Sequence, residues 1–169
     1  MPDASESDAT VARWRAAAES GDVDAAVTCL SPSIVLSSPL TDQFRLEGTD
    51  QLRDFLTEAF KAVEHIRFHT QTGQDDTYAL VYRAHVAGQP FEEAQLLRLD
   101  EEARISEITL FGRPMPALTA LMTTLGPALA RQQGRRGLAT LLRVSAAPIH
   151  AMVTSGDRSV VPRTQPREP

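Results

Sequence analysis

With 169 residues the chain is long enough for one domain with appendages, and its 42% hydrophobic and 23% charged residues exclude an intrinsically disordered protein. The net charge of −5 argues against a general nucleic-acid-binding protein, so we expect no nucleic-acid partner. The charge is uneven, because residues 1–113 carry 10 basic and 20 acidic side chains, whereas residues 114–169 carry 7 and 2. An acidic part is therefore followed by a basic one.

The sequence also indicates a compartment. Its single cysteine, Cys29, cannot form an internal disulfide, which fits a reducing environment. The polar, acidic residues 1–10 do not resemble a signal peptide. No segment offers the roughly 18 uninterrupted apolar residues that a transmembrane helix needs. We therefore expect a cytoplasmic protein.

Two predicted helices open the chain. Residues 1–7 are expected to be disordered, and Asp8 then caps a helix that runs to about Glu19. Gly21 suits the position just after a helix, and Asp22 suits the cap of the next one. The sequence therefore predicts a tight helix-to-helix junction at this point.

A short strand and a third helix come next. Residues 34–38 are typical of a strand, which Pro39 ends. Gly48-Thr49 marks the start of a helix, capped by Thr49 or Asp50. Apolar residues recur along this helix at helical spacing, in the clearest amphipathic pattern of the chain: Leu52, Phe55, Leu56, Ala59, Phe60 and Val63.

Four strands are then predicted, at residues 65–72, 77–87, 91–99 and 105–111. The turns between them are short, which favours antiparallel hairpins. The last strand alternates, which predicts one shared face for Ile105, Glu107, Thr109 and Phe111. Helices covering one face of a curved antiparallel sheet give an α+β fold.

Residues 114–154 are predicted to be a helical extension that Gly126-Pro127 interrupts, and residues 155–169 a disordered tail rich in Pro and Arg. Three interpretations of the extension remain open. It caps the mouth of the preceding domain or pads a dimer interface, it binds a partner protein, or it contacts an anionic membrane surface through its basic, amphipathic helices.

Three stretches of residues 8–113 resemble the nuclear transport factor 2-like superfamily, which includes ketosteroid isomerases and SnoaL-type polyketide cyclases. They are VARWRAAAESGDVDAAVTCLSPSIVLSSPL, GTDQLRDFLTEAFK and ARISEITLFG. The resemblance implies a cone, in which a strongly bent sheet wraps around a long helix and leaves a pocket at the open end. It also implies a homodimer formed through the outer sheet face.

The same resemblance places the ketosteroid isomerase catalytic positions on this chain. The tyrosine position falls at Trp14, the carboxylate base at Ser38 and the protonated acid at Ala94. None of the three carries the group that the isomerase mechanism uses. We therefore do not expect ketosteroid isomerase chemistry by that mechanism.

The expected pocket combines these positions with the residues that share their strand faces. If Ala94 and Phe111 face inward, the period of two brings Leu96, Thr109 and Glu107 with them. A buried Glu107 would have a raised pKa and could act as an acid or a base, whereas pairing with Arg98 would keep it ionised. The full expected lining is Trp14, Ser38, Leu56, Ala94, Leu96, Glu107, Thr109 and Phe111.

Three functions follow from this sequence. The first is binding of a small, largely apolar molecule in a cavity of a few hundred Å³. The second is acid–base catalysis by Glu107, as a cyclase, isomerase or hydrolase, on a polyketide- or terpenoid-like substrate. The third is a non-catalytic interaction module that uses the outer sheet and the C-terminal helices.

The histidines lack the spacing of a metal site, and no phosphate or dinucleotide motif is present, so neither metal nor cofactor is expected.

Overall fold

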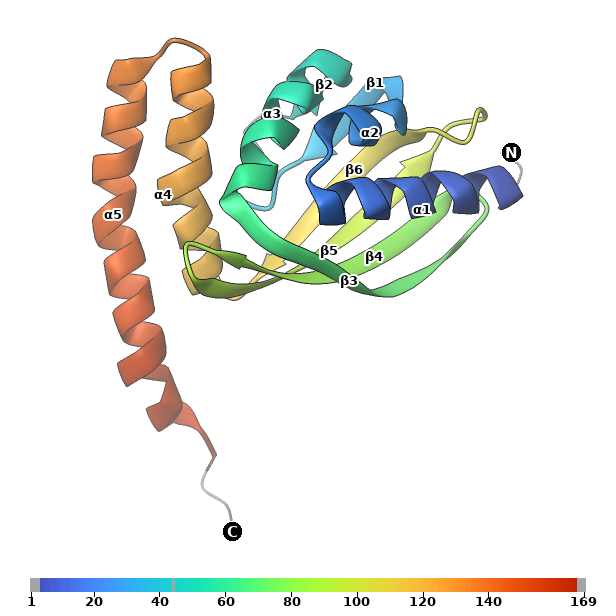
Figure 1. Ribbon diagram of the computed structural model, residues 1–169. Helices are drawn as coiled ribbons and strands as arrows, with labels where there is room; N and C mark the ends of the chain where they lie inside the picture. Colours follow the sequence, from blue (N-terminus) through green and yellow to red (C-terminus); the bar gives the residue numbers. More distant parts are fainter. Residues whose placement is uncertain (1–3, 44, 167–169) are drawn as a thin grey trace.

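The computed structural model describes residues 4–43 and 45–166. Two helices, two strands and a third helix come first, and a run of long strands and a pair of long helices follow (Figure 1). In chain order the elements are α1 (Ala4–Ser20), α2 (Val23–Thr28), β1 (Leu30–Ser37), β2 (Leu46–Glu47), α3 (Gly48–Ala62), β3 (Val63–Gln74), β4 (Thr77–Val86), β5 (Gln89–Leu99), β6 (Ile105–Arg113), α4 (Met115–Gln132), α5 (Arg136–Ser159) and the short 3-10 helix η1 (Val161–Thr164).

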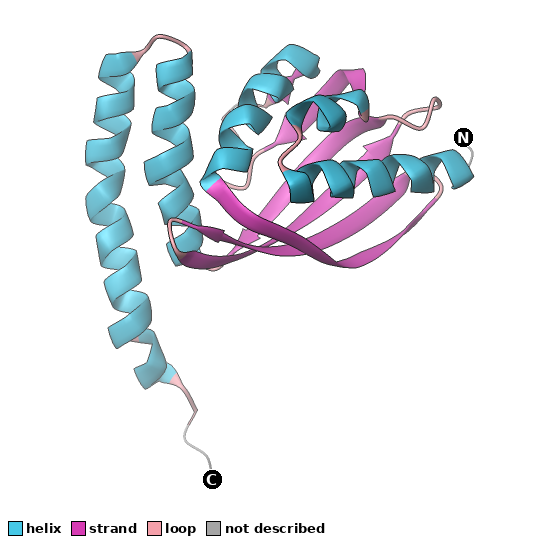
Figure 2. Ribbon diagram, viewed as in Figure 1, coloured by secondary structure: helices cyan, strands magenta, loops and turns pink. Residues whose placement is uncertain are grey.

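The strands form one sheet in the order β2-β1-β6-β5-β4-β3. Every neighbouring pair is antiparallel except β1 and β6, which are parallel. The sheet curves around α1, α2 and α3, which all lie against its concave face (Figure 2). The predicted α+β cone with a C-terminal helical extension is confirmed.

The core lies between the concave face and the three helices. It is built from apolar side chains at helical spacing on α1 and α3 and at alternate positions on the strands. Its largest fully buried members include Trp14, Leu52, Leu80, Leu97 and Ile108. The face of each strand that carries such residues is the one that turns inward.

The junction of the first two helices forms as predicted. Gly21 has a positive φ of 71°, and the next amide, that of Asp22, donates to the Ala17 carbonyl over 2.9 Å. The Asp22 carboxylate in turn accepts from the Ala25 amide over 2.9 Å and caps α2. The prediction of disorder before Asp8 is wrong for residues 4–7, which are helical, because Tyr78 of β4 donates to Asp8 over 2.9 Å and holds this end of α1.

A β-bulge interrupts the alternation of β6. Arg98 of β5 pairs with Glu107, but the next residue, Leu99, pairs with Ile105, so Ser106 is an extra residue on β6. Ile105 and Ile108 are consequently both buried, although they are three positions apart. Glu107 does not share the face of Ile105, contrary to the strict alternation that the sequence predicted.

The C-terminal helices are longer and less interrupted than predicted. α4 passes through Gly126-Pro127 without a break, because the ring of Pro127 is fully buried and its packing offsets the lost backbone hydrogen bond. α5 continues beyond residue 154 to Ser159 and is followed by η1, so the predicted disorder of the tail is wrong for residues 155–164. Propagating an existing helix adds a hydrogen bond per residue, which favours this extension.

α4 and α5 form an antiparallel hairpin that stands beside the open end of the cone (Figure 1). α4 is the inner helix and contacts α3 and strands β4, β5 and β6. Gln132 at its end donates to Asp54 of α3 over 2.9 Å. At its start, Leu118 packs so closely on Gly112 that a Cβ there would lie 2.8 Å from the Leu118 Cδ2 atom.

Candidate functional site

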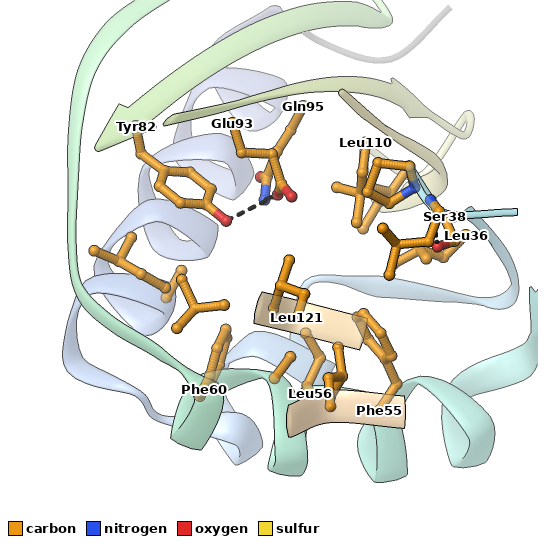
Figure 3. A pocket seen from close by; sticks show the side chains of 18 of the residues that line it. Leu36, Ser38, Phe55, Leu56, Phe60, Tyr82, Glu93, Gln95, Leu110 and Leu121 are labelled. Atoms are coloured by element: carbon orange, nitrogen blue, oxygen red, sulfur yellow. Dashed lines mark hydrogen bonds between the residues drawn. The ribbon is translucent and has the colours of Figure 1, made fainter. Parts of the chain in front are cut away.

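A cavity lies inside the cone, between the concave sheet face, α1, α3 and α4 (Figure 3). We call it the inner cavity, and its volume is about 60 Å³. Its walls are predominantly apolar, and α4 contributes Leu121 and Leu125 to them. The hairpin therefore closes the end at which the cone would otherwise be open.

Four polar side chains meet at one wall of this cavity. The Tyr82 hydroxyl donates to Glu93 Oε1 over 2.8 Å, and the Gln95 amide donates to the same oxygen over 3.4 Å. Trp14 Nε1 donates to Gln95 Oε1 over 2.9 Å. Both hydrogen bonds to Glu93 end at Oε1, so neither occupies Oε2. Figure 3 shows Tyr82 and Glu93 pointing toward each other.

The sheet places these groups by simple geometry. Tyr82 of β4 and Glu93 of β5 are direct cross-strand partners, so their side chains leave the sheet next to each other. Gln95 is two residues further along β5 and therefore lies on the same face. Trp14 reaches the group from α1, whose buried face crosses the sheet at this point.

The environment makes Glu93 unusual. Its side chain is almost completely removed from water, with 5% of the residue exposed, and this burial raises its pKa from 4.5 to about 7. The hydrogen bonds from Tyr82 and Gln95 act in the opposite direction but are weaker effects. Burial and the neighbouring carboxylate also raise the pKa of Tyr82 well above its ordinary value.

This arrangement can transfer or donate a proton near neutral pH. A carboxyl group with a pKa of about 7 is present in both forms there, which is the condition that general acid–base groups need. In its protonated form Glu93 can donate a hydrogen bond into the cavity. In its ionised form Tyr82 and Gln95 stabilise the negative charge on Oε1.

The SnoaL-like domain family matches residues 11–108 of the chain. The chain belongs to the SnoaL-like domain family. Its fold is that of the nuclear transport factor 2-like superfamily, and no curated protein matches it in sequence.

Solved structures support the fold at low sequence identity. A steroid delta-isomerase from Pseudomonas aeruginosa is 23% identical over 76% of this chain and 92% of its own, with a TM-score of 0.65. A bacterial protein with a cystatin-like fold from Silicibacter pomeroyi is 20% identical over 76% and 93%, with a TM-score of 0.66. The epoxide hydrolase/cyclase-like enzyme SalBIII of salinomycin pyran ring formation is 20% identical over 67% and 94%, with a TM-score of 0.56.

Three of the expected pocket residues line the inner cavity of this SnoaL-like protein. They are Trp14 of α1, Leu56 of α3 and Ser38, which follows β1. Ser38 Oγ accepts from the Leu40 amide over 3.1 Å, so its own proton is free to be donated elsewhere. The sequence thus located the helical wall of the cavity and the end of its first strand.

The expectations for the two sheet strands are wrong. On β5, Ala94 and Leu96 lie on the convex, outer face, because their neighbours Glu93 and Gln95 point inward. On β6, Thr109 and Phe111 also lie on the outer face, and Phe111 is 58% exposed. The resemblance therefore assigned the protonated-acid position one residue away from the carboxyl group that lies in the cavity.

Glu107 does not enter the cavity either. Its side chain is 42% exposed on the outer face, and its Oε2 lies 3.8 Å from Arg98 Nε on the neighbouring strand. This is the ion-paired alternative that the sequence left open. The hypothesis that Glu107 is the catalytic group is consequently wrong, and the bulge at Ser106 is the reason for its placement.

The sequence contains a signal that would have identified Glu93. Along β5 the residues in phase with Glu93 and Gln95 are Phe91, Leu97 and Leu99, whereas the opposite phase contains Glu92 and Arg98. The more apolar phase of a half-buried strand is the one that faces the core. Tyr82 carries the same kind of signal, because Leu80, Ala84 and Val86 are in phase with it on β4, whereas the opposite phase contains Arg83 and His85. Only its contact with Glu93 depends on the pairing of two strands.

Two further findings concern metal binding and membrane spanning. Within residues 4–43 and 45–166, His, Cys, Asp and Glu side chains do not gather in groups of three that could hold a metal ion. None of the helices in this described part of the chain combines the length and apolarity that crossing a membrane requires.

Proposed function

We propose that this SnoaL-like protein binds a small, largely apolar molecule in the inner cavity, with protonated Glu93 donating a hydrogen bond to an oxygen of that molecule. The observation that carries this proposal is the enclosure of one carboxyl group, with Oε2 unpaired, in a cavity whose other walls are mainly apolar. A buried donor of this kind selects a ligand that offers an acceptor, because an unmatched polar group in an apolar site is costly.

A short ketone such as 2-pentanone tests the proposal, because it presents one acceptor oxygen and a small apolar body. Trp14 is the only tryptophan, so its indole N–H gives a single resonance beside the cavity. We expect 2-pentanone to shift this resonance in a saturable way at about pH 5.5 and to bind roughly tenfold or more weakly at about pH 8.5, because ionised Glu93 cannot donate.

Glu93→Leu supplies the decisive variant and Glu107→Gln its control. Loss of the donor in Glu93→Leu is expected to abolish the pH dependence of binding, whereas Glu107→Gln changes a carboxylate on the outer face and is expected to leave it intact. Equal 2-pentanone affinity in the wild type at the two pH values would contradict the proposal, as would an unchanged pH dependence in Glu93→Leu.

Acid–base catalysis by Glu93 is the second candidate, and the pKa of about 7 specifically favours it. Glu93 would remove a proton from carbon next to a carbonyl group, or donate one to its oxygen, in an isomerisation or cyclisation. Two of the similar solved structures are described as enzymes of these reaction classes. One is the steroid delta-isomerase, and the other is the epoxide hydrolase/cyclase-like enzyme SalBIII. This likeness supports a shared fold, so acid–base catalysis is inferred from the position and pKa of Glu93.

Deuterium exchange measures this activity without knowledge of the natural substrate. In D₂O the protein is expected to accelerate exchange of the protons next to the carbonyl of 2-pentanone, and Glu93→Gln is expected to remove the acceleration. Exchange at the uncatalysed rate in the presence of saturating wild-type protein would reject catalysis and leave the binding proposal standing.

A further inference from the structure

A second hollow adjoins the inner cavity and is built largely by the C-terminal hairpin. We call it the hairpin groove. Its volume is about 230 Å³, and its own lining includes Leu46, Met122, Leu129, Leu142, Ala146 and Ile149. None of its lining residues in the described chain is charged. The groove therefore suits an uncharged apolar group and disfavours an ionic one.

The groove and the inner cavity are neighbours with a common wall. Both are lined by Ser38, Leu40, Phe55 and Leu125. Leu125 is a buried residue of α4, so one helix closes the cavity on one side and forms the groove on the other. A molecule that begins at Glu93 and grows toward α4 reaches this wall first.

The sizes of the two spaces complement each other. The inner cavity, at about 60 Å³, has room for only a few water-sized groups. It is much smaller than the space of a few hundred Å³ that the sequence led us to expect, and only together with the groove is that size approached. A ligand with more than a few non-hydrogen atoms must therefore extend toward the groove.

We propose that the hairpin groove binds the hydrocarbon chain of the same molecule whose oxygen is bound by Glu93. This inference rests on the proposed function, because it takes Glu93 as the anchor. The ligand class is an uncharged molecule with a carbonyl, hydroxyl or ether oxygen near one end and a slim apolar chain that passes between Leu40, Phe55 and Leu125. Two neighbouring hollows that share an apolar wall suit an extended molecule better than a broad one.

The C-terminal hairpin then determines how long a hydrocarbon chain of the ligand can be bound. α4 and α5 begin after residue 113, whereas the SnoaL-like match ends at residue 108. The family domain supplies the polar anchor, and the C-terminal addition supplies the surface that distinguishes long from short ligands. Ile149 of α5 is the residue to change, because it lines the groove and is 43% exposed, so a larger side chain there does not disturb the buried core.

The experiment compares straight-chain 2-alkanones from 2-pentanone to 2-undecanone, titrated against the full chain at about pH 5.5. We expect the affinity to rise about fourfold for each methylene group that enters the groove. Ile149→Trp is expected to weaken 2-undecanone binding roughly tenfold or more, since blocking burial of two methylene groups suffices for that loss, and to leave 2-pentanone binding unchanged.

Val144→Trp is the matched control, because Val144 is also on α5 but is 63% exposed and does not line the groove. It is expected to bind both ketones as the wild type does. Met122→Trp repeats the test from α4 if circular dichroism shows that Ile149→Trp is unfolded.

The outcomes separate the two proposals. Binding of 2-pentanone that depends on Glu93, without any gain from longer chains, overturns the inference about the groove and leaves the proposed function intact. An equal loss for both ketones in Ile149→Trp, or no loss for either, also overturns it. If no 2-alkanone binds the wild type, the proposed function and this inference fail together.

Discussion

Tyr82 and Glu93 are direct cross-strand partners on the concave face of the sheet, and the tyrosine hydroxyl lies 2.8 Å from the glutamate Oε1 atom. The pair is buried, and it introduces the only acidic side chain among the residues that line the inner cavity in the described structure. Burial favours the neutral carboxyl group, whereas the tyrosine hydrogen bond favours the ionised one. The balance between these effects gives the first two predictions.

Glu93 is expected to make the protein less stable as the pH rises. Its pKa is 4.5 when unfolded and about 7 when folded, so between these values the folded state binds more protons than the unfolded state. Its contribution is full below pH 4.5 and is lost as the pH rises through about 7, an effect of about 3 kcal/mol. Urea unfolding of the wild type and Glu93→Gln over this range measures it. The free energy of unfolding is expected to fall less steeply with pH in Glu93→Gln than in the wild type, and equal slopes would contradict the prediction.

Removing the tyrosine hydroxyl is expected to raise the pKa of Glu93 further. In Tyr82→Phe the carboxylate loses a donor that stabilises its charge, while its burial is unchanged. The pKa is read from the carboxyl carbon resonance of Glu93. Tyr78→Phe is the matched control, because the Tyr78 hydroxyl bonds to Asp8 rather than to Glu93. A lower pKa in Tyr82→Phe would show that the hydroxyl does not support the charge.

Gly112 is expected to contribute to stability by allowing the hairpin to pack closely on β6. A Cβ at this position would lie 2.8 Å from Leu118 and 2.9 Å from the ring of Phe91, which is buried. Gly112→Ala should therefore cost about 1–3 kcal/mol of stability. Gly156→Ala is the control, because a Cβ there has open space within α5 and should stabilise the protein by up to about 1 kcal/mol. Thermal unfolding of both variants compares these effects, and equal stability of Gly112→Ala and the wild type would contradict the clash.

The outer sheet face is expected to mediate a homodimer. Phe111 is 58% exposed there and lies in a cross-strand row with Ala94 and Val81, bordered by the charged Glu92 and Arg113. An exposed aromatic ring favours burial against a partner. Sedimentation analysis is expected to show a dimer for the wild type and a monomer for Phe111→Glu. Leu141→Glu, at an equally exposed position on α5, should leave the dimer intact. A wild-type monomer at high protein concentration would reject this interface.

Much of the fold was predictable because it depends on local patterns. The Gly21-Asp22 junction follows from helix-capping chemistry, and the amphipathic face of α3 follows from its spacing. Of the site residues contributed by helices, Leu56 belongs to that amphipathic face, whereas Trp14 was found through the resemblance to the ketosteroid isomerases. A helix with one apolar face has only one way to bury it.

The strand part of the site was not found, because a strand has two faces and a single bulge exchanges them. Ser106 shifts the phase of β6, which moves Glu107 to the outer face although Ile105 remains inside. On β5 the sequence predicted Ala94 on the inner face, whereas the inner face carries Glu93. An error of one residue in strand phase was therefore enough to assign the wrong acidic side chain to the cavity.

The sequence by itself determined the order of the helices and of the longer strands and the family fold, because capping, turn chemistry and hydrophobic period act over a few neighbouring residues. The two-residue strand β2 was not among its predictions. Only the tertiary structure decided which side chains surround Glu93, since it meets Tyr82, Gln95 and Trp14 through strand pairing and helix packing. It also decided that α4 closes the cavity and forms the hairpin groove on its other side. Both depend on contacts between residues far apart in the chain, which local patterns do not encode.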